Sequence, residues 1–189
     1  MSSGMRFASA VVLAMLAAVP AAAAPASAPI EGAWSPSVDG VRARLVVTPY
    51  VDASKHAQLS IAVEIENTSD RGMPITLAAG APSQMLDLAV EDGQGKTIER
   101  SAIGGNELTP PPFVLALPVR SMLRVVIAPN ALEYVPSGRV MLRPFSLTAW
   151  EVPAKHGAMV MKATLHPVET KDVKGAWGGK IAVPGVRVM

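Results

Sequence analysis

Apolar and polar residues alternate with a period of two along much of the chain, as they do in strands that bury one face. The pattern is clearest at 59–66, where Ser60, Ala62, Glu64 and Glu66 separate the apolar residues Leu59, Ile61, Val63 and Ile65. The apolar set is expected to face a core. Glu64 and Glu66 are expected to face water, as are Arg42 and Arg44.

The same alternation predicts further strands at 41–47, 86–90, 123–127, 140–142, 159–165 and 181–188. Pro184 and Gly185 interrupt the last of these, which predicts a bulge or break. The polar run at 67–70 and the run at 92–95 have the composition of turns. Asn67-Thr68-Ser69 also fits the acceptor pattern for N-glycosylation.

No segment carries a helical repeat over three turns. The chain has 17 prolines and 15 glycines, and they fall at about strand-length intervals. Short strands at such a spacing predict an all-β sandwich or barrel, and their unequal lengths favour an antiparallel β-sandwich. The two longest segments without a strand pattern, 103–112 and 148–157, are expected to be loops.

The N-terminal 26 residues have the layout of a secretory signal peptide. One basic residue, Arg6, precedes a 13-residue apolar run from Phe7 to Val19, and small residues follow Pro20. A membrane helix needs about 20 apolar residues, so the run is too short to be one. We therefore expect residues 1–26 to be removed, residues 27–189 to form one domain, and the protein to be periplasmic or secreted.

Composition excludes several classes of function. Removing residues 1–26 takes away one charge, Arg6, and leaves 16 basic against 15 acidic residues, a net charge of +1. Nucleic-acid binding calls for clustered basic charge, which this balance does not supply. The chain has no cysteine, which excludes thiol nucleophiles, zinc–thiolate sites and lipid attachment at an N-terminal Cys.

The strongest candidate for metal chemistry is a set of thioether and imidazole side chains near the C-terminus. Met159 and Met161 would point the same way from one strand, with His156 before them and His166 after them. Such ligands suit Cu(I), so a copper site is one interpretation. The other is that the methionines fill the core.

No sequence motif of a known catalytic site is present. The chain lacks a His-Glu-x-x-His, a Gly-x-Ser-x-Gly and a glycine-rich phosphate loop. We assign no catalytic residue and no cofactor, and expect the protein not to be an enzyme. The three tryptophans either plug the ends of the sandwich or form an exposed binding platform: Trp34, Trp150 and Trp177.

Four short stretches together resemble a known family. They are Trp34 to Leu45, Val63 to Asp70, Val90 to Lys96 and Trp177 to Ile181. Glu64-Ile65-Glu66-Asn67-Thr68-Ser69-Asp70 matches a common strand end, and Asp92-Gly93-Gln94-Gly95-Lys96 a common hairpin, of exported bacterial immunoglobulin-like domains. These include domains grouped with the intracellular proteinase inhibitor type.

The resemblance implies an immunoglobulin-like sandwich of about seven to nine strands. It also implies a non-catalytic binding or accessory role, with another envelope or secreted protein as the partner. We expect that partner to meet an open sheet edge, where backbone hydrogen bonds give affinity, or the loops at 103–112 and 148–157. The alternative is a periplasmic copper-binding protein that uses His156, Met159, Met161 and His166 as ligands.

Overall fold

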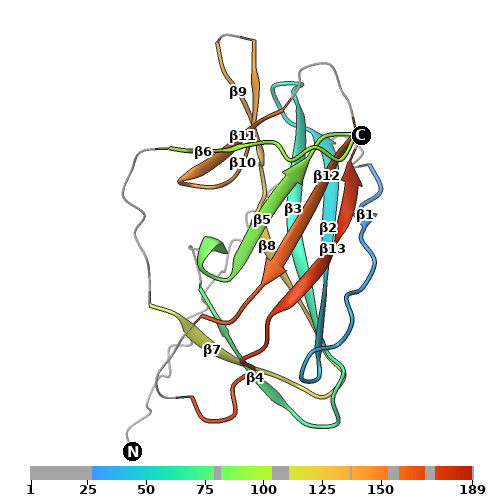
Figure 1. Ribbon diagram of the computed structural model, residues 1–189, viewed down its shortest axis with the longest axis vertical. Helices are drawn as coiled ribbons and strands as arrows, with labels where there is room; N and C mark the ends of the chain where they lie inside the picture. The colour runs from blue at the N-terminus through green and yellow to red at the C-terminus, as the bar shows by residue number, and fades with distance from the viewer. Residues whose placement is uncertain are drawn as a thin grey trace, which may run out of the picture.

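The computed structural model describes residues 27–78, 82–103, 111–136, 138–152, 158–168 and 173–188. In this part of the chain the strands form four antiparallel sheets, and one short 3-10 helix is the only helix (Figure 1). The all-β fold class predicted from the alternation is therefore confirmed. The predicted signal peptide, residues 1–26, lies outside the described residues, and the division at residue 26 stays a prediction.

Two sheets face each other as layers. The first has the order β1 (Ile30–Glu31), β2 (Val41–Val51), β3 (Ala57–Asn67), β8 (Met122–Ala128). The second has the order β13 (Ile181–Val188), β12 (Met159–Leu165), β5 (Leu86–Glu91). Figure 1 shows β5, β12 and β13 lying across β2, β3 and β8, and β13 contacts β2 at one side. The arrangement is a β-sandwich.

Two smaller sheets extend this sandwich. One has the order β6 (Arg100–Ala102), β11 (Thr148–Val152), β10 (Val140–Phe145), β9 (Leu132–Tyr134). The other is a pair, β4 (Met73–Leu77) with β7 (Phe113–Leu117). The 3-10 helix η1 (Pro82–Gln84) leads into β5. Figure 1 places the β6-β11-β10-β9 sheet at one end of the sandwich and the β4-β7 pair at the other.

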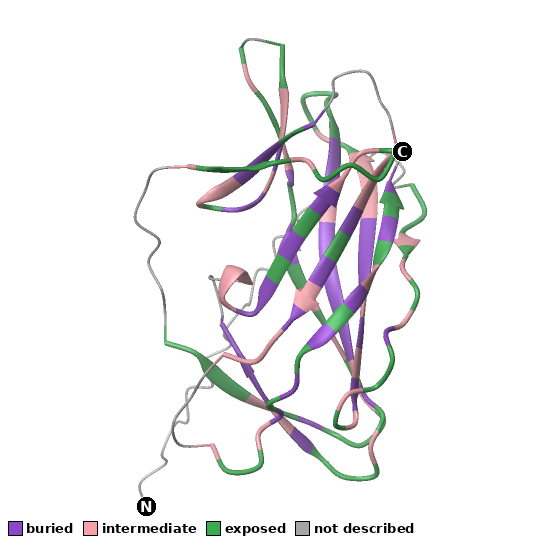
Figure 2. Ribbon diagram, in the orientation of Figure 1, coloured by how far each residue is buried: buried purple, intermediate pink, exposed green. Residues whose placement is uncertain are grey.

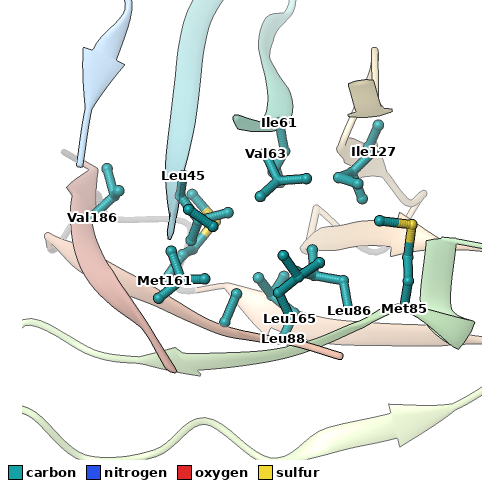
Figure 3. Close-up of a cluster of buried hydrophobic side chains, with 14 of the residues drawn as sticks. Leu45, Ile61, Val63, Met85, Leu86, Leu88, Ile127, Met161, Leu165 and Val186 are labelled. Carbon is teal, nitrogen blue, oxygen red and sulfur yellow. The ribbon is translucent and has the colours of Figure 1, made fainter. Parts of the chain in front are cut away.

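The core lies between the two main layers. Leu45, Ile61, Val63 and Ile127 come from the first sheet and meet side chains of the second, including Leu88, Met161, Leu165 and Val186 (Figure 3). Burial alternates along β5, β12 and β13, as the banding in Figure 2 shows. This confirms the alternation as the signal that determines which residues enter the core.

A bulge in β13 keeps its apolar residues inside. Met161 pairs with Val186 and Ala163 with Val183, so β13 uses one residue more than β12 between the two pairs. Ile181 and Val183 are buried before this irregularity, and Val186 and Val188 after it. Without the extra residue the second set would point to solvent, because one added residue reverses the face. The bulge predicted at Pro184-Gly185 is confirmed.

The segment after β1 closes one side of the sandwich. Gly32 N–H donates to the carbonyl of Leu45 (2.8 Å), and Ser35 N–H to the carbonyl of Ala43 (2.9 Å), so residues 32–35 continue beside β2. A Cβ at Gly32 would lie 2.6 Å from Val186 Cγ2 and 3.2 Å from the Leu45 carbonyl oxygen. Glycine is required here because β2 and β13 both approach this backbone closely.

The seven strands that the alternation predicts are confirmed as β2, β3, β5, β8, β10, β12 and β13. The described residues hold thirteen strands in all, more than the seven to nine expected. The additional strands are two to five residues long and carry little alternation. One of them corrects a prediction: residues 148–152 are not loop but strand β11, which pairs with both β10 and β6. Residues 153–157 lie outside the described residues.

Candidate functional site

Strand β8 pairs with another described strand along only one of its two edges. It pairs with β3 on one side and ends the order of its sheet on the other. Asn67 N–H donates to the carbonyl of Ser121 (3.0 Å), which fixes Asn67 and Ser121 as a hydrogen-bonded pair. Such pairs alternate in an antiparallel ladder, so Leu123 and Val125 direct their backbone groups at β3.

The intervening residues therefore direct their backbone groups away from β3. Met122, Arg124 and Val126 sit opposite Glu66, Glu64 and Ala62 in the non-hydrogen-bonded positions. Their N–H and C=O groups form the outer edge of the sheet. A row of such groups is a template for pairing with another extended chain.

A groove of about 590 Å³ runs along this edge. Five consecutive residues of β8, 123–127, line it, so the groove follows the edge of the strand and not one of its faces. The other walls are mainly apolar and come from four elements or their ends: Leu77, Ala78, Pro82, Met85, Phe113, Leu115, Pro144, Phe145 and Ser146. Phe113 and Val126 are large apolar residues that remain 45% and 55% exposed there.

The outer face of the same sheet carries a row of alternating charges. Arg44 Nη1 lies 2.6 Å from Glu31 Oε2, and Arg44 Nε lies 2.7 Å from Glu64 Oε2. Arg124 Nη1 lies 3.6 Å from Glu64 Oε1. The order across β1, β2, β3 and β8 is therefore acid, base, acid, base. We call these four residues, Glu31, Arg44, Glu64 and Arg124, the charge ladder.

Glu64 was expected to face water, but it is only 4% exposed and is therefore buried. Arg44 and Arg124 cover it from the two neighbouring strands. Burial of Arg44 opposes its charged form, but hydrogen bonds and charge from Glu64 and Glu31 outweigh this and raise the Arg44 pKa above its usual value. Glu66 is more exposed and pairs with Arg42 at 2.7 Å.

Trp34 packs on the two arginines of β2. The guanidinium carbons of Arg42 and Arg44 each lie 4.7 Å from the centroid of its ring, the geometry of cation–π contacts. Trp150 and Trp177 are 2% and 3% exposed and belong to the core. These two do not form an exposed binding platform, and the face of Trp34 is occupied by arginine.

Of the predicted copper ligands, Met159 and Met161 lie on β12. Met161 is fully buried between the sheets, Met159 is half-buried, and His156 lies outside the described residues. His166 follows the end of β12, five residues beyond Met161, or about 16 Å at the rise of an extended chain. One ion cannot span Met161 and His166. His166 Nε2 instead lies 3.6 Å from Asp87 Oδ2.

Within the described ranges, no group of three or more His, Cys, Asp or Glu side chains is placed to hold a metal ion. The same ranges contain no helix long and apolar enough to cross a membrane. Of the segment 103–112, residues 104–110 lie outside the described residues, and Pro111 and Pro112 lead directly into β7.

Asn67 holds a turn together and is not available for glycosylation. Its residue is 0% exposed, and its amide nitrogen donates to the carbonyls of Arg71, Leu117 and Pro118 at 2.8, 3.1 and 3.0 Å. Its oxygen accepts from the N–H and hydroxyl of Ser69 at 3.0 and 2.6 Å. The acceptor pattern in the sequence therefore marks a buried structural residue.

Comparison with known proteins gives no match to a family model, a curated protein or a solved structure. The site residues at the β8 edge were not singled out by their sequence. The run Met122-Leu123-Arg124-Val125-Val126-Ile127 indicates a strand, but which strand ends a sheet depends on pairing between distant segments. For the groove walls, the sequence offers one signal: the wall residues Phe113 and Phe145 each directly follow a proline.

Proposed function

We propose that this protein is an exported, non-catalytic binding module, and that another envelope or secreted protein adds an extended strand to the outer edge of β8. The observation that carries this proposal is the alignment of an unpaired strand edge with an apolar groove. Strand addition needs both features. Backbone groups supply affinity, and pockets for alternate side chains supply specificity. The signal-peptide pattern at residues 1–26 supports export.

We also infer that the two main layers form an immunoglobulin-like sandwich. In that fold, strands A, B, E and D make one sheet and strands C, F and G the other. The order β2-β3-β8 facing β5-β12-β13 supports the assignment of β2, β3 and β8 as A, B and E, and of β5, β12 and β13 as C, F and G. Strands β9, β10 and β11 are then an insertion between E and F.

This assignment bears directly on binding. In the immunoglobulin-like order, strand D lies beside strand E. Because β8 corresponds to E, the position of D is along the outer edge of β8. Between β5 and β8 this chain has β6 and β7, but they pair with β11 and β4. No described strand of the chain takes the position of D. A strand from a partner would complete the sheet there.

The test uses proline as a backbone probe. The N–H of Val126 points away from β3, so Val126→Pro removes an outward donor and no donor of the β3–β8 ladder. Met122→Pro does the same four residues earlier in β8. Val126→Thr keeps the donor and the branched shape and serves as the matched control. Circular dichroism verifies that each variant folds.

Partners are trapped in cells that express the full chain with a photo-reactive residue at position 126, and the cross-linked protein is then purified. The control carries the same residue at position 187 on β13. We expect cross-links from position 126 into one extended segment of a single partner, and their loss in the Met122→Pro background. Cross-links that arise equally from position 187, or that persist in a folded Met122→Pro variant, contradict strand addition at β8.

A further inference from the structure

The charge ladder ends at the edge where we place the partner. Arg44 pairs directly opposite Glu64 in the β2–β3 register, and Glu64 directly opposite Arg124 in the β3–β8 register. The two inner members of the ladder therefore have an opposite charge on both neighbouring strands. Arg44 lies between Glu31 and Glu64, and Glu64 lies between Arg44 and Arg124. Arg124 has an acidic neighbour on one side, and its other side is the outer edge of β8.

The two oxygens of Glu64 are not shared equally between the arginines. Arg44 approaches to 2.7 Å, which is hydrogen-bond distance, whereas Arg124 stays at 3.6 Å, beyond it. The side chain of Arg124 is 45% exposed, and that of Arg44 is 17% exposed. A guanidinium group has five N–H donors. Arg124 is therefore placed to donate to a carboxylate on the next strand outward.

The groove beside β8 favours apolar side chains on an added strand. Leu123 and Val125 point to the face opposite Arg124, pack against the core, and line the groove together with Phe113 and Phe145. In an added strand, successive side chains point to opposite faces of the sheet. Residues beside Leu123 and Val125 would enter an apolar groove, and the residue between them would face Arg124.

We propose that the strand added at β8 carries an acidic side chain opposite Arg124, with apolar residues immediately before and after it. This rests on the proposed function and names the partner by its chemistry. A second copy that offered its own β8 edge would not meet this requirement, because Met122–Ala128 contains no acidic residue. Two β8 edges paired antiparallel about this point would set Arg124 against Arg124, and like charges directly opposite each other destabilise a sheet.

The test uses three fluorescein-labelled peptides with the sequence Thr-Val-Thr-Val-Xaa-Val-Thr-Val-Thr, where Xaa is Glu, Gln or Lys. The sequence is symmetrical, so it offers the same alternation in either strand direction. Fluorescence anisotropy measures the Kd for the whole protein, for Arg124→Gln, and for Arg187→Gln. Arg187 is an exposed arginine on β13, away from the β8 edge, and its variant is the matched control.

We expect the Glu peptide to bind roughly threefold to tenfold more tightly than the Lys peptide, since cross-strand charge pairs have effects of this order. The difference is expected to shrink at high salt, to vanish in Arg124→Gln, and to persist in Arg187→Gln. Equal binding of the three peptides to the unchanged protein overturns the acidic preference. That result leaves strand addition standing if Val126→Pro abolishes binding.

Failure of the proposed function has a different signature. If no peptide binds at millimolar concentration, or if folded Val126→Pro and Met122→Pro bind all three peptides as well as Val126→Thr does, the edge of β8 is not the site. Both the acidic preference and strand addition at β8 are then wrong.

Discussion

The side-chain amide of Asn67 donates a hydrogen bond to the carbonyl oxygen of Leu117 at 3.1 Å, across 50 residues of sequence. The contact joins the end of β3 to the end of β7, and through Pro118 to the turn that begins β8. Asn67 therefore anchors the turn that leads into β8, at the Met122 end of the β3–β8 pair.

Replacing Asn67 by Ala is expected to destabilise the protein by about 2–4 kcal/mol, because buried carbonyl groups lose their donor and are left unpaired. Urea denaturation measures the change. Asn130→Ala is the control, because Asn130 is exposed and accepts from the Tyr50 hydroxyl at the surface. A loss for Asn67→Ala no larger than that for Asn130→Ala would contradict the anchoring role.

The two glutamates of β3 are expected to differ. Glu64→Gln should destabilise the fold by about 1–3 kcal/mol, because Arg44 and Arg124 lose a buried countercharge. Glu66→Gln, in a more exposed pair, should change stability by less than about 1 kcal/mol. Chemical denaturation of the two variants compares them directly. Equal effects would mean that Glu64 is solvated as Glu66 is.

Gly32 is expected to tolerate no side chain. Gly32→Ala places a Cβ against Val186 and the backbone of Leu45, and we expect a loss of about 1–3 kcal/mol from overpacking. Gly178→Ala is the matched control, since a Cβ there has no heavy atom within 4 Å. Thermal unfolding separates the two. Unchanged stability in Gly32→Ala would show that residues 32–35 do not lie between β2 and β13.

The methionines of β12 are expected to act as core residues. Met161→Leu should cost less than about 1.5 kcal/mol and Met161→Ala about 2–5 kcal/mol, since Met161 is fully buried. The double variant Met159→Leu with Met161→Leu should leave Cu(I) binding unchanged in a titration. Stoichiometric Cu(I) binding that the double variant loses would favour the copper-binding alternative, with His156 as the remaining ligand to test.

Seven strands and the bulge in β13 were predictable because each depends on the local order of apolar residues. Ile181, Val183, Val186 and Val188 share one face only if a residue is added between them, and Pro184-Gly185 marks where. Strand β11 was missed because two of its three buried residues, Ala149 and Trp150, are adjacent, which leaves too short an alternation to predict a strand.

The features that suggest function were not predictable in the same way. Glu64 has the sequence pattern of a surface residue, and its burial follows from arginines 20 and 60 residues away. The outer edge of β8 exists because β6 and β7 pair elsewhere. Each depends on pairing between distant segments, which period-two alternation does not encode.

Amide hydrogen exchange on ¹⁵N-labelled protein tests the central claim most directly. In the unliganded protein, the amides of Leu123 and Val125 should exchange slowly because they face β3, and those of Met122, Arg124 and Val126 should exchange fast. Adding the Glu peptide should slow this second set alone. Slow exchange of all five amides before any addition would show that the edge of β8 is already covered, and would contradict the account.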